Sequence, residues 1–425
     1  MRKNMGSIVP SSWCAGCGSC AILCPSAAVS IKLDNNLGYY KASKNDNLCI
    51  NCGLCQSICP FVKTDYSLLN LEIFGKIPDY FWLGNYNDCF IGNSTDPDIR
   101  YNSSSGGMIT QLLIWALDEN IIDGALVTRM SSENPLHSEP IIARNKADII
   151  EAAGSKYCPV PSNLALKEIL NSNDGERFAV VGLPCQILGI RKLEKRNSIL
   201  KEKIIMHLGL FCSHTLSYNA TLFLLGNLGI DKFSIKKIRY RGEGWPGKLQ
   251  LVLSDGRNRI LPLSDYYDIC FGAFSPKCCT LCVDHTNILA DISFGDAWLS
   301  EYRDDNIGKS IIIPRNEVGQ NYLNKALLSN CIEINRIDPN QVTKSQKYFH
   351  RKRKEVAIRS KIYKLLQKDV PQHALIDVAI SFEDMPIFIY REIAMNLCNH
   401  KHLWPLLKAH KTLFNLSRTI RGDLK

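Results

Sequence analysis

The sequence predicts an α/β protein in three parts: a small cysteine-rich module at residues 1–65, a mixed α/β domain at residues 80–315 and a helical tail at residues 345–425. Three observations give this division. Two cysteine runs with one spacing occupy the first sixty residues. Apolar strand-like runs then alternate with helix-like segments from Tyr80 to about Trp298, and the end of the chain combines helical periodicity with many basic residues. A composition that is 45% hydrophobic and 22% charged is enough to bury a sizeable core beyond the first module.

The first module is defined by the pattern Cys-x2-Cys-x2-Cys-x3-Cys-Pro, which occurs twice. This is the spacing with which bacterial ferredoxins bind two [4Fe-4S] clusters, the fourth cysteine of each run ligating the other cluster. We therefore expect a ferredoxin-like fold with one cluster bound by Cys14, Cys17, Cys20 and Cys59, and the other by Cys49, Cys52, Cys55 and Cys24. Pro25 and Pro60 end the short helical turns that carry the fourth cysteines, because proline does not continue the hydrogen-bond ladder.

Zinc sites and disulfide bonds fit this cysteine pattern less well. A pair of zinc sites needs four ligands each but not a third cysteine, a fourth after three residues and a proline, all repeated. A disulfide framework requires an oxidising compartment, and residues 1–12 contain no apolar signal segment. We expect a cytoplasmic protein with reduced thiols.

Alternating segments define the rest of the predicted fold. A hairpin is expected from Val29–Leu33 and Gly38–Ala42 around a turn at Asp34. Strands are predicted at 81–83, 124–128, 178–182, 204–211, 249–253 and 309–313, and helices at 107–119, 163–170, 186–195 and 321–328.

Several turns at strand ends and helix starts carry the residues that suit a cofactor. Ser103, Ser104, Ser105, Gly106 and Gly107 lead into the predicted helix at 107–119, and hydroxyls, glycine N–H groups and a helix N-terminus together suit the pyrophosphate of a flavin. Gly154, Ser155 and Lys156 offer small residues beside a cation for a phosphate or a flavin ring. Gly182, Pro184 and Gln186 surround Cys185 in a turn from strand to helix, the edge at which α/β sheets place their sites.

Cysteines in these turns suggest a further cluster. Cys185 and Cys212 each follow a predicted strand, and Cys279 and Cys282 form a Cys-x2-Cys pair. Taken singly, free cysteines are usually core residues, but together these four supply the thiolates of a third [4Fe-4S] cluster. Cys278 is a possible substitute for Cys279.

Six motifs in one order extend over about three quarters of the chain. They are Ser103–Gly107, Ala153–Tyr157, Val181–Gln186, Gly209–Cys212, Cys279-x2-Cys282-x-Asp284 and Ala290–Asp296. In these motifs the chain resembles the beta-subunit family of coenzyme F420 hydrogenases and dehydrogenases, a group to which 7-hydroxymethyl chlorophyll a reductase is also similar. The segment Tyr240–Lys248 resembles bacterial members associated with polysaccharide pathways, and Leu183 stands where many relatives have Thr.

This resemblance implies a flavoprotein with FAD between iron-sulfur clusters and a hydride carrier or organic substrate. The first function to consider is thus an oxidoreductase that exchanges electrons with ferredoxin or a reduced deazaflavin such as coenzyme F420; the alternative is a non-catalytic subunit that connects a partner enzyme to ferredoxin. A radical enzyme ranks third, because its Cys-x3-Cys-x2-Cys signature is absent. His214, Tyr157 and Asp284 are the candidate proton donors.

Charge adds one expectation about partners. The net charge is +10, and basic residues gather beyond residue 350, including Lys352, Arg359, Lys408 and Arg418. Such a stretch is more often a solvated helix face than a binding site, although peripheral contact with a membrane or an acidic redox partner is an alternative. No nucleic-acid-binding motif accompanies it, and no apolar run is long enough to span a membrane.

Overall fold

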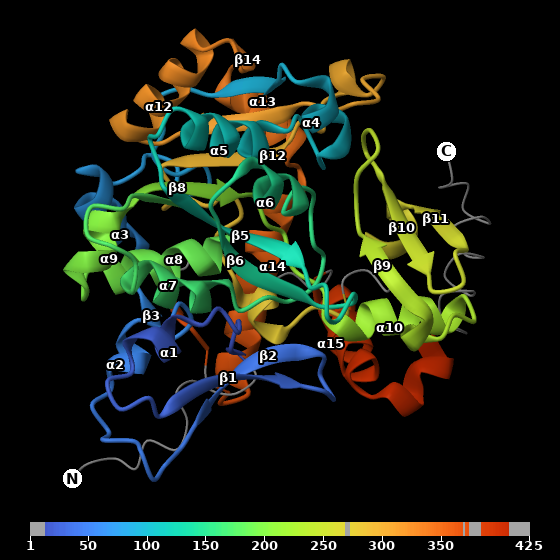
Figure 1. The fold of residues 1–425 in the computed structure, drawn as a ribbon. Coiled ribbons are helices and arrows are strands. Elements are labelled where there is room, and N and C mark those ends of the chain that lie inside the picture. Colours follow the sequence, from blue (N-terminus) through green and yellow to red (C-terminus); the bar gives the residue numbers. More distant parts are fainter. Residues whose placement is uncertain (1–12, 268–272, 369, 374–383, 408–425) are drawn as a thin grey trace.

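The computed structural model describes residues 13–267, 273–368, 370–373 and 384–407 of the chain. At the N-terminus the short helices α1 (Ser19–Leu23) and α2 (Leu54–Ser57) flank the antiparallel hairpin β1 (Val29–Asp34) and β2 (Tyr39–Lys44) (Figure 1, blue). Asp34 closes the hairpin by accepting the N–H groups of Asn36 and Leu37. Gly18 and Gly53 precede the two helices with φ of 100° and 76°, a backbone region that favours glycine. The predicted hairpin is confirmed.

An eight-stranded mixed sheet forms the centre of the molecule, in the order β14-β4-β13-β12-β8-β7-β5-β6. Neighbours β5, β7, β8 and β12 are parallel, so their carboxyl ends share one edge of the sheet. The strands are β4 (Phe90–Ser94), β5 (Gly124–Met130), β6 (Ser138–Ala143), β7 (Phe178–Gly182), β8 (Ile204–Leu210), β12 (Ile292–Asp296), β13 (Ser310–Pro314) and β14 (Ile332–Arg336).

Helices cover both faces of this sheet. Alternate residues of one strand point to opposite faces, and Ala179 packs with α5 (Met108–Asp118) and α12 (Glu317–Leu328), whereas Val180 packs with α7 (Leu166–Leu170), α8 (Pro184–Glu194) and α9 (Ser198–Lys203). The other helices in this part are α3 (Tyr66–Phe74), α4 (Pro97–Asn102) and α6 (Lys146–Glu151). The central domain therefore has three layers.

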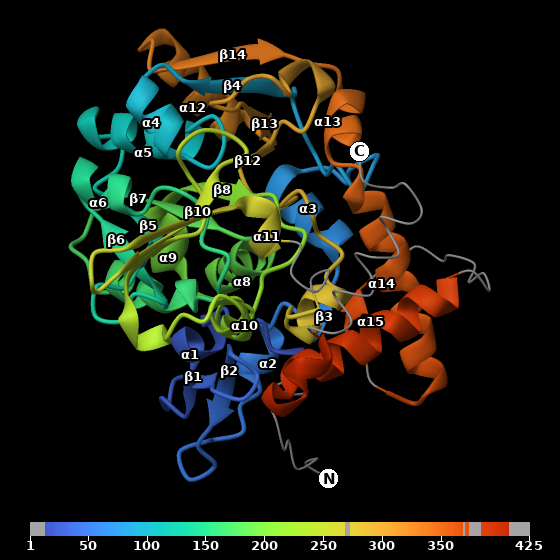
Figure 2. The same ribbon diagram turned by 90° about the vertical axis from the view of Figure 1, so that its right-hand side faces the viewer.

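A second, smaller sheet is inserted between β8 and β12. Its strands β9 (Ile235–Arg239), β10 (Lys248–Leu253) and β11 (Asn258–Pro262) pack with α10 (Tyr218–Asn227) and α11 (Leu263–Tyr267), to the right in Figure 1. The last elements are α13 (Pro339–Ser345), α14 (Tyr348–Leu365), the two-residue strand β15 (Gln372–His373) and α15 (Asp384–Asn399), and β15 pairs with β3 (Lys63–Thr64) of the N-terminal part. Figure 2 shows α14 and α15 lying together beside the first module.

Most predicted elements of the α/β domain are confirmed, with one correction in that domain and one in the tail. No strand forms at 81–83, where the chain makes a turn, and the strand at 249–253 belongs to the small sheet. Lys352 and Arg359 are 5% and 3% exposed, so they are not part of a solvated basic face. Lys408 and Arg418 lie outside the described residues. None of the described helices combines the length and apolar character of a membrane-crossing segment.

Candidate functional site

The eight cysteines of the first module fall into two groups in space. Cys24, Cys49, Cys52 and Cys55 line one small pocket, whereas Cys14 and Cys59 pack against a separate core with Trp13 and Phe61. Burial, and then the thiols of Cys17, Cys14, Cys59 and, last, Cys55, raise the pKa of Cys20. Burial likewise raises the pKa of Cys55, and the nearby thiols of Cys52, Cys24 and Cys49 raise it further. Each group thus contains three cysteines of one run and the fourth cysteine of the other, the crossed arrangement expected for two cubane clusters.

Backbone N–H groups point at some of these thiols. Cys14 Sγ accepts from Gly16 N at 3.4 Å and from Ala42 N at 3.3 Å, and Cys24 Sγ accepts from Ala28 N at 3.2 Å. Such bonds stabilise negative charge on sulfur and so adjust the reduction potential of a bound cluster.

A third group of thiols lies where the parallel strands end. Cys185 follows β7 at the start of α8, and Cys212 follows β8. The short 3₁₀ segment η5 (Lys277–Leu281) carries Cys278 and Cys279, and Cys282 directly follows it. Burial raises the pKa of Cys185 strongly, and the thiols of Cys17, Cys282, Cys212 and Cys279 raise it further. The structure therefore brings the four cysteines predicted for a third cluster together, next to the first module.

Cys278 differs from its neighbour Cys279. It is 2% exposed and packs in a hydrophobic core with Trp13, Phe61 and Leu281. Among the described residues, no three His, Cys, Asp or Glu side chains are arranged to hold a single metal ion.

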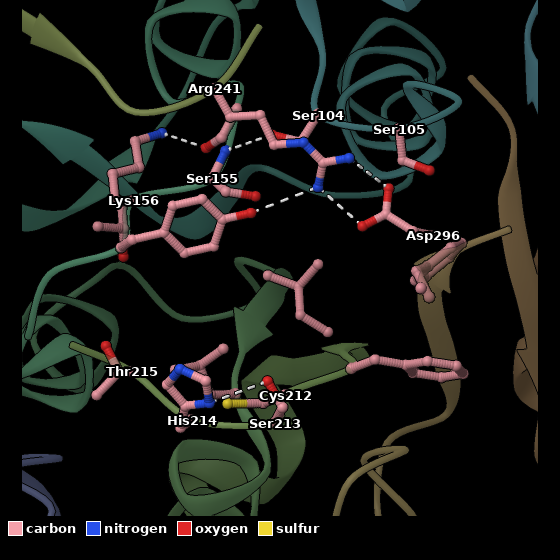
Figure 3. Close-up of a pocket in the computed structure, with 18 of the residues that line it drawn as sticks. Ser104, Ser105, Ser155, Lys156, Cys212, Ser213, His214, Thr215, Arg241 and Asp296 are labelled. Atoms are coloured by element: carbon pink, nitrogen blue, oxygen red, sulfur yellow. Dashed lines mark hydrogen bonds and ion pairs between the residues drawn. The ribbon is translucent and has the colours of Figure 1, made fainter. Parts of the chain in front are cut away.

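One cavity of about 1330 Å³ joins the third group of thiols to the predicted cofactor turns. Its walls include the third group of thiols, which is Cys185, Cys212, Cys278, Cys279 and Cys282. They also include residues of the three turns predicted to bind a cofactor. Lining residues from the predicted set are Ser103, Ser104, Ser105, Gly107, Gly154, Ser155, Lys156, Tyr157, Gly182, Pro184, Gln186 and His214. Figure 3 shows Ser104, Ser105, Ser155 and Arg241 on one side of this space and Cys212, Ser213 and His214 on the other.

The segment before α5 is held by hydrogen bonds to the residue preceding β13 and to the turn after α6. Ser105 Oγ donates to the carbonyl of Lys309 at 2.7 Å, and Ser104 Oγ accepts the N–H of Ser155 at 2.6 Å. Gly107 precedes α5 with φ of 75°, and no side chain caps the N–H groups of the first turn. Ser103 Oγ is buried and has no hydrogen-bond partner among the described residues. Gly106, unlike its neighbours, is not among the lining residues: its N–H donates to the hydroxyl of Ser310, a residue that does line the cavity.

Lys156 is held differently from what a phosphate ligand requires. Its ammonium donates to the carbonyl of Ala152 and, at 3.0 Å each, to those of Ala153 and Gly154, at the end of α6. Burial lowers the pKa of Lys156 to about 7. Its amine thus stabilises the turn that carries Ser155 and Tyr157 while the side chain lines the cavity.

Gln186 and its turn hold the start of α8 in place. Gln186 Oε1 accepts the N–H of Leu183 at 2.8 Å, and its amide donates to the carbonyl of Val160. Pro184 occupies the first turn of the helix, where its missing N–H costs no hydrogen bond. These contacts fix the position of Cys185.

Arg241 and Asp296 form a buried ion pair that the sequence did not indicate. Two Arg241 nitrogens each lie 2.8 Å from an Asp296 oxygen (Figure 3), Trp245 Nε1 donates to the same carboxylate at 3.1 Å, and Arg241 Nη1 lies 3.4 Å from the Tyr157 hydroxyl. Asp296 ends β12 and Arg241 follows β9, so only the fold brings them together. The sequence signal for a functional role was their position: Arg241 lies in the segment Tyr240–Lys248 and Asp296 in the motif Ala290–Asp296.

The three predicted proton donors have different surroundings. Tyr157 and His214 line the cavity. Burial lowers the pKa of His214 to about 4, and Lys352 and Arg391 act in the same direction, so the imidazole is neutral at pH 7. Asp284 is not among the lining residues: its carboxylate accepts the N–H groups of Asn287 and Ile288 and serves the local turn. The structure therefore places Asp284 outside the cavity walls, beside Cys282.

Comparison with known families follows the same division of the chain. Residues 89–167 match the N-terminal part, and residues 175–340 the C-terminal part, of the family described as coenzyme F420 hydrogenase/dehydrogenase, beta subunit. The chain belongs to this family. Residues 13–62 match a 4Fe-4S dicluster domain, which confirms the prediction of two iron-sulfur clusters over zinc or disulfides.

Similar proteins carry names of the same kind. The coenzyme F420 hydrogenase subunit beta of Methanothermobacter thermautotrophicus is 29% identical over 261 residues, 60% of this chain and 86% of that protein. The coenzyme F420-dependent sulfite reductase of Methanocaldococcus jannaschii is 29% identical over 354 residues, 79% of this chain and 49% of that protein.

A solved structure supports the fold. A chain of the F420-reducing [NiFe] hydrogenase complex from Methanosarcina barkeri is 26% identical, with a TM-score of 0.55, and the match covers 70% of this chain and 99% of that one. This member of the F420 beta-subunit family is thus an iron-sulfur protein of an oxidoreductase family.

Proposed function

We propose that this chain transfers electrons between a redox-partner protein and a small molecule that gives or takes a hydride, by way of its [4Fe-4S] clusters and an FAD bound in the cavity. The names of the relatives make a deazaflavin of the coenzyme F420 type the first small molecule to test. The observation that carries the proposal is the shared cavity, because one space is lined by the Ser103–Gly107 turn and by the third group of thiols.

The cavity has the features that a flavin nucleotide requires. Its volume of about 1330 Å³ exceeds that of most small-ligand sites, about 300–1000 Å³. The uncapped first turn of α5 supplies N–H groups and a positive helix end for a pyrophosphate. Ser103 Oγ supports this assignment independently, since a buried hydroxyl without a partner costs free energy unless a ligand completes it.

The residues of the chain then have distinct roles. Ser103, Ser104 and the start of α5 bind the pyrophosphate. The Arg241–Asp296 pair lies on the same side of the cavity and, beside Tyr157, shapes its wall. Tyr157 and His214 are the proposed proton-transfer groups, since both line the cavity. When bound, FAD converts two-electron hydride chemistry to the one-electron transfer of an iron-sulfur cluster.

We further propose that Cys185, Cys212, Cys279 and Cys282 bind a third [4Fe-4S] cluster. These four lie on two strand ends and one short segment that meet at the cavity. Cys278 is the less suitable ligand, because it is buried inside the core around Trp13 and Phe61, whereas Cys279 is partly exposed at the edge of that core. Such a cluster would lie between the first module and the flavin.

Iron and flavin analysis tests these assignments. After anaerobic purification we expect one FAD and about twelve irons and twelve sulfides per chain. Cys212→Ser should lower the iron and sulfide contents to about eight each. The matched control Cys331→Ser, at a half-buried cysteine outside the cavity, should keep the wild-type content. About eight irons in wild type, unchanged in Cys212→Ser, would contradict the third cluster.

Rapid mixing identifies the electron partners. The purified protein is mixed with reduced coenzyme F420, reduced ferredoxin or NAD(P)H, and flavin absorbance is followed. Bleaching by reduced F420 supports a hydride route through the cavity, and bleaching by ferredoxin alone assigns the protein partner and leaves another organic substrate to be found. Absence of any flavin signal from the loaded protein would reject the proposal.

The surface near the second group of thiols is the proposed contact for a protein partner. Cys52 is exposed there, and the neighbouring Ile50 is 65% exposed. Electron transfer between proteins needs a short distance, so a cluster at the surface suits this role.

A second candidate function is a non-catalytic electron-transfer subunit. It is favoured by the names of relatives that are subunits, and by the sulfite reductase, about half of whose length lies outside the match. An isolated chain that reduces flavin but turns over no substrate, together with a stable hetero-complex, would select this alternative.

A further inference from the structure

Helix α14 contributes to the third group of thiols although it begins beyond the matched family region, which ends at residue 340. Its inward face is formed by Lys352, Val356, Arg359 and Tyr363, which are between 1% and 5% exposed and repeat with the period of a helix. This face packs against η5, the segment that carries Cys279. Figure 2 shows the helix within the body of the molecule rather than as a free tail.

Two cations of this face bind backbone carbonyls of the thiol-bearing segments. Lys352 Nζ donates to the carbonyl of Cys212 at 3.1 Å, and Arg359 Nη1 donates to that of Thr280 at 3.1 Å. Arg359 also has a carboxylate partner, since its Nε lies 3.0 Å from Glu392 Oε1. The ammonium of Lys352 is thus fixed directly behind one proposed ligand.

The charge of Lys352 acts on several of the thiols. Burial raises the pKa of Cys212 to about 12 and also raises that of Cys282, and Lys352 opposes the increase at both. At Cys279 the hydrogen bond from Cys278 is the main cause of a pKa lowered to about 7, and Lys352 adds to it. The geometry agrees: Lys352 Nζ binds the carbonyl of Cys212, and Lys352 lines one small pocket with Cys279 and the large cavity with Cys282.

A cation in this position has a defined effect on a bound cluster. A cubane with four thiolates carries a net negative charge, and reduction adds one more electron to it. Since charges interact more strongly in a buried site than in water, a fixed positive charge stabilises the reduced form more than the oxidised form.

We propose that Lys352 is a positioning residue that raises the reduction potential of the third [4Fe-4S] cluster by holding a buried positive charge behind Cys212. This inference rests on the proposed function, because it requires that cluster. It assigns to the C-terminal helix a part in setting the direction of electron flow between the first module and the cavity.

The test compares four variants of the full chain, purified anaerobically. Lys352→Met removes the charge at similar length, Lys352→Arg retains it, and Lys352→Gln keeps a hydrogen-bond donor without charge. Lys354→Met removes an exposed charge from the same helix and is the matched control. Iron content is measured first, and the midpoint potential of each cluster is then obtained by redox titration followed by electron paramagnetic resonance.

We expect wild-type iron in all variants and a shift of one cluster to a more negative potential in Lys352→Met and Lys352→Gln only. An unchanged potential in fully loaded neutral variants overturns the inference and leaves the third cluster intact. Loss of about four irons in both neutral variants, but not in Lys352→Arg, overturns a tuning role and makes Lys352 a requirement for assembly. About eight irons in wild type overturns the third cluster itself, which separates failure of the proposed function from failure of this inference.

Discussion

Replacing Asp291 by Asn should strongly destabilise the region where the central sheet carries the site. Asp291 precedes β12 and its carboxylate accepts four hydrogen bonds: from His207 N at 2.8 Å, His207 Nδ1 at 2.9 Å, Arg191 Nη2 at 2.7 Å and Asn316 Nδ2 at 2.7 Å. Glu194 Oε1 lies 2.7 Å from the other nitrogen of His207 and completes the group. Two carboxylates therefore face two cations in a buried environment.

The magnitude follows from what the substitution leaves behind. An amide keeps the shape but removes one negative charge, so Arg191 and His207 are left with Glu194 alone. Hydrogen bonds to charged groups contribute about 1.5–3 kcal/mol each, and removing one partner of a buried pair costs about 3–5 kcal/mol. We expect a loss of about 3–5 kcal/mol, equivalent to roughly two to four orders of magnitude in the local opening equilibrium.

Hydrogen exchange of β8 and β12 measures this loss without requiring a reversible two-state transition of the whole chain. The control is Asp255→Asn, since Asp255 forms an exposed ion pair with Arg257 and solvent screens such pairs so that they add little to stability. If protection of the two strands fell less than about tenfold in Asp291→Asn, and no more than in the control, the energetic role given to this network would be refuted.

Three further predictions concern pH and the cavity walls. Burial and Arg191 act against protonation of His207, but its two carboxylate neighbours raise the pKa of His207 overall. The stability contributed by its protonation is complete below about pH 6.5 and is lost as pH rises through the raised value. Corrected hydrogen-exchange protection of β8 should therefore fall in alkaline solution in wild type but not in His207→Gln. Gly106→Ala should reduce the ratio of flavin to protein, because the added Cβ would lie 2.5 Å from the carbonyl oxygen of Gly92, whereas Gly226→Ala, with no atom within 4 Å, should leave it unchanged. Lys156→Met should also lower flavin retention by releasing the carbonyls at the end of α6, and an unaltered ratio would exclude Lys156 from the cofactor site.

Local patterns predicted the central parts of the fold well. The strand at Phe178–Gly182 has the predicted bounds, because a short apolar run ends at a glycine and a proline that begins the next helix. Strand β4 was missed because Gly92 and Asn93 interrupt its apolar pattern, and it is formed by pairing with two strands more than 200 residues away.

The site was predictable where one segment carries the chemistry and not where distant segments meet. The turn at Ser103–Gly107 and the cysteines at strand ends are recognisable from spacing. The partnership of Arg241 with Asp296 and the burial of Lys352 are not, because each depends on packing between elements far apart in the sequence. The composition of a basic helix does not show whether a given lysine is exposed to solvent or, like Lys352, buried against a cysteine-bearing segment.

The pairing of β3 with β15 and the core shared by Trp13, Phe61 and Tyr363 have a consequence for biosynthesis. The first cysteines leave the ribosome some 350 residues before the helix that covers them, an interval of roughly tens of seconds at about 5–20 residues per second. The thiols of the first module are therefore synthesised long before their covering helices. Cys14 and Cys59, which pack with Tyr363 of α14 and Phe388 of α15, are therefore uncovered until late in translation, whereas Cys52 stays exposed in the folded chain.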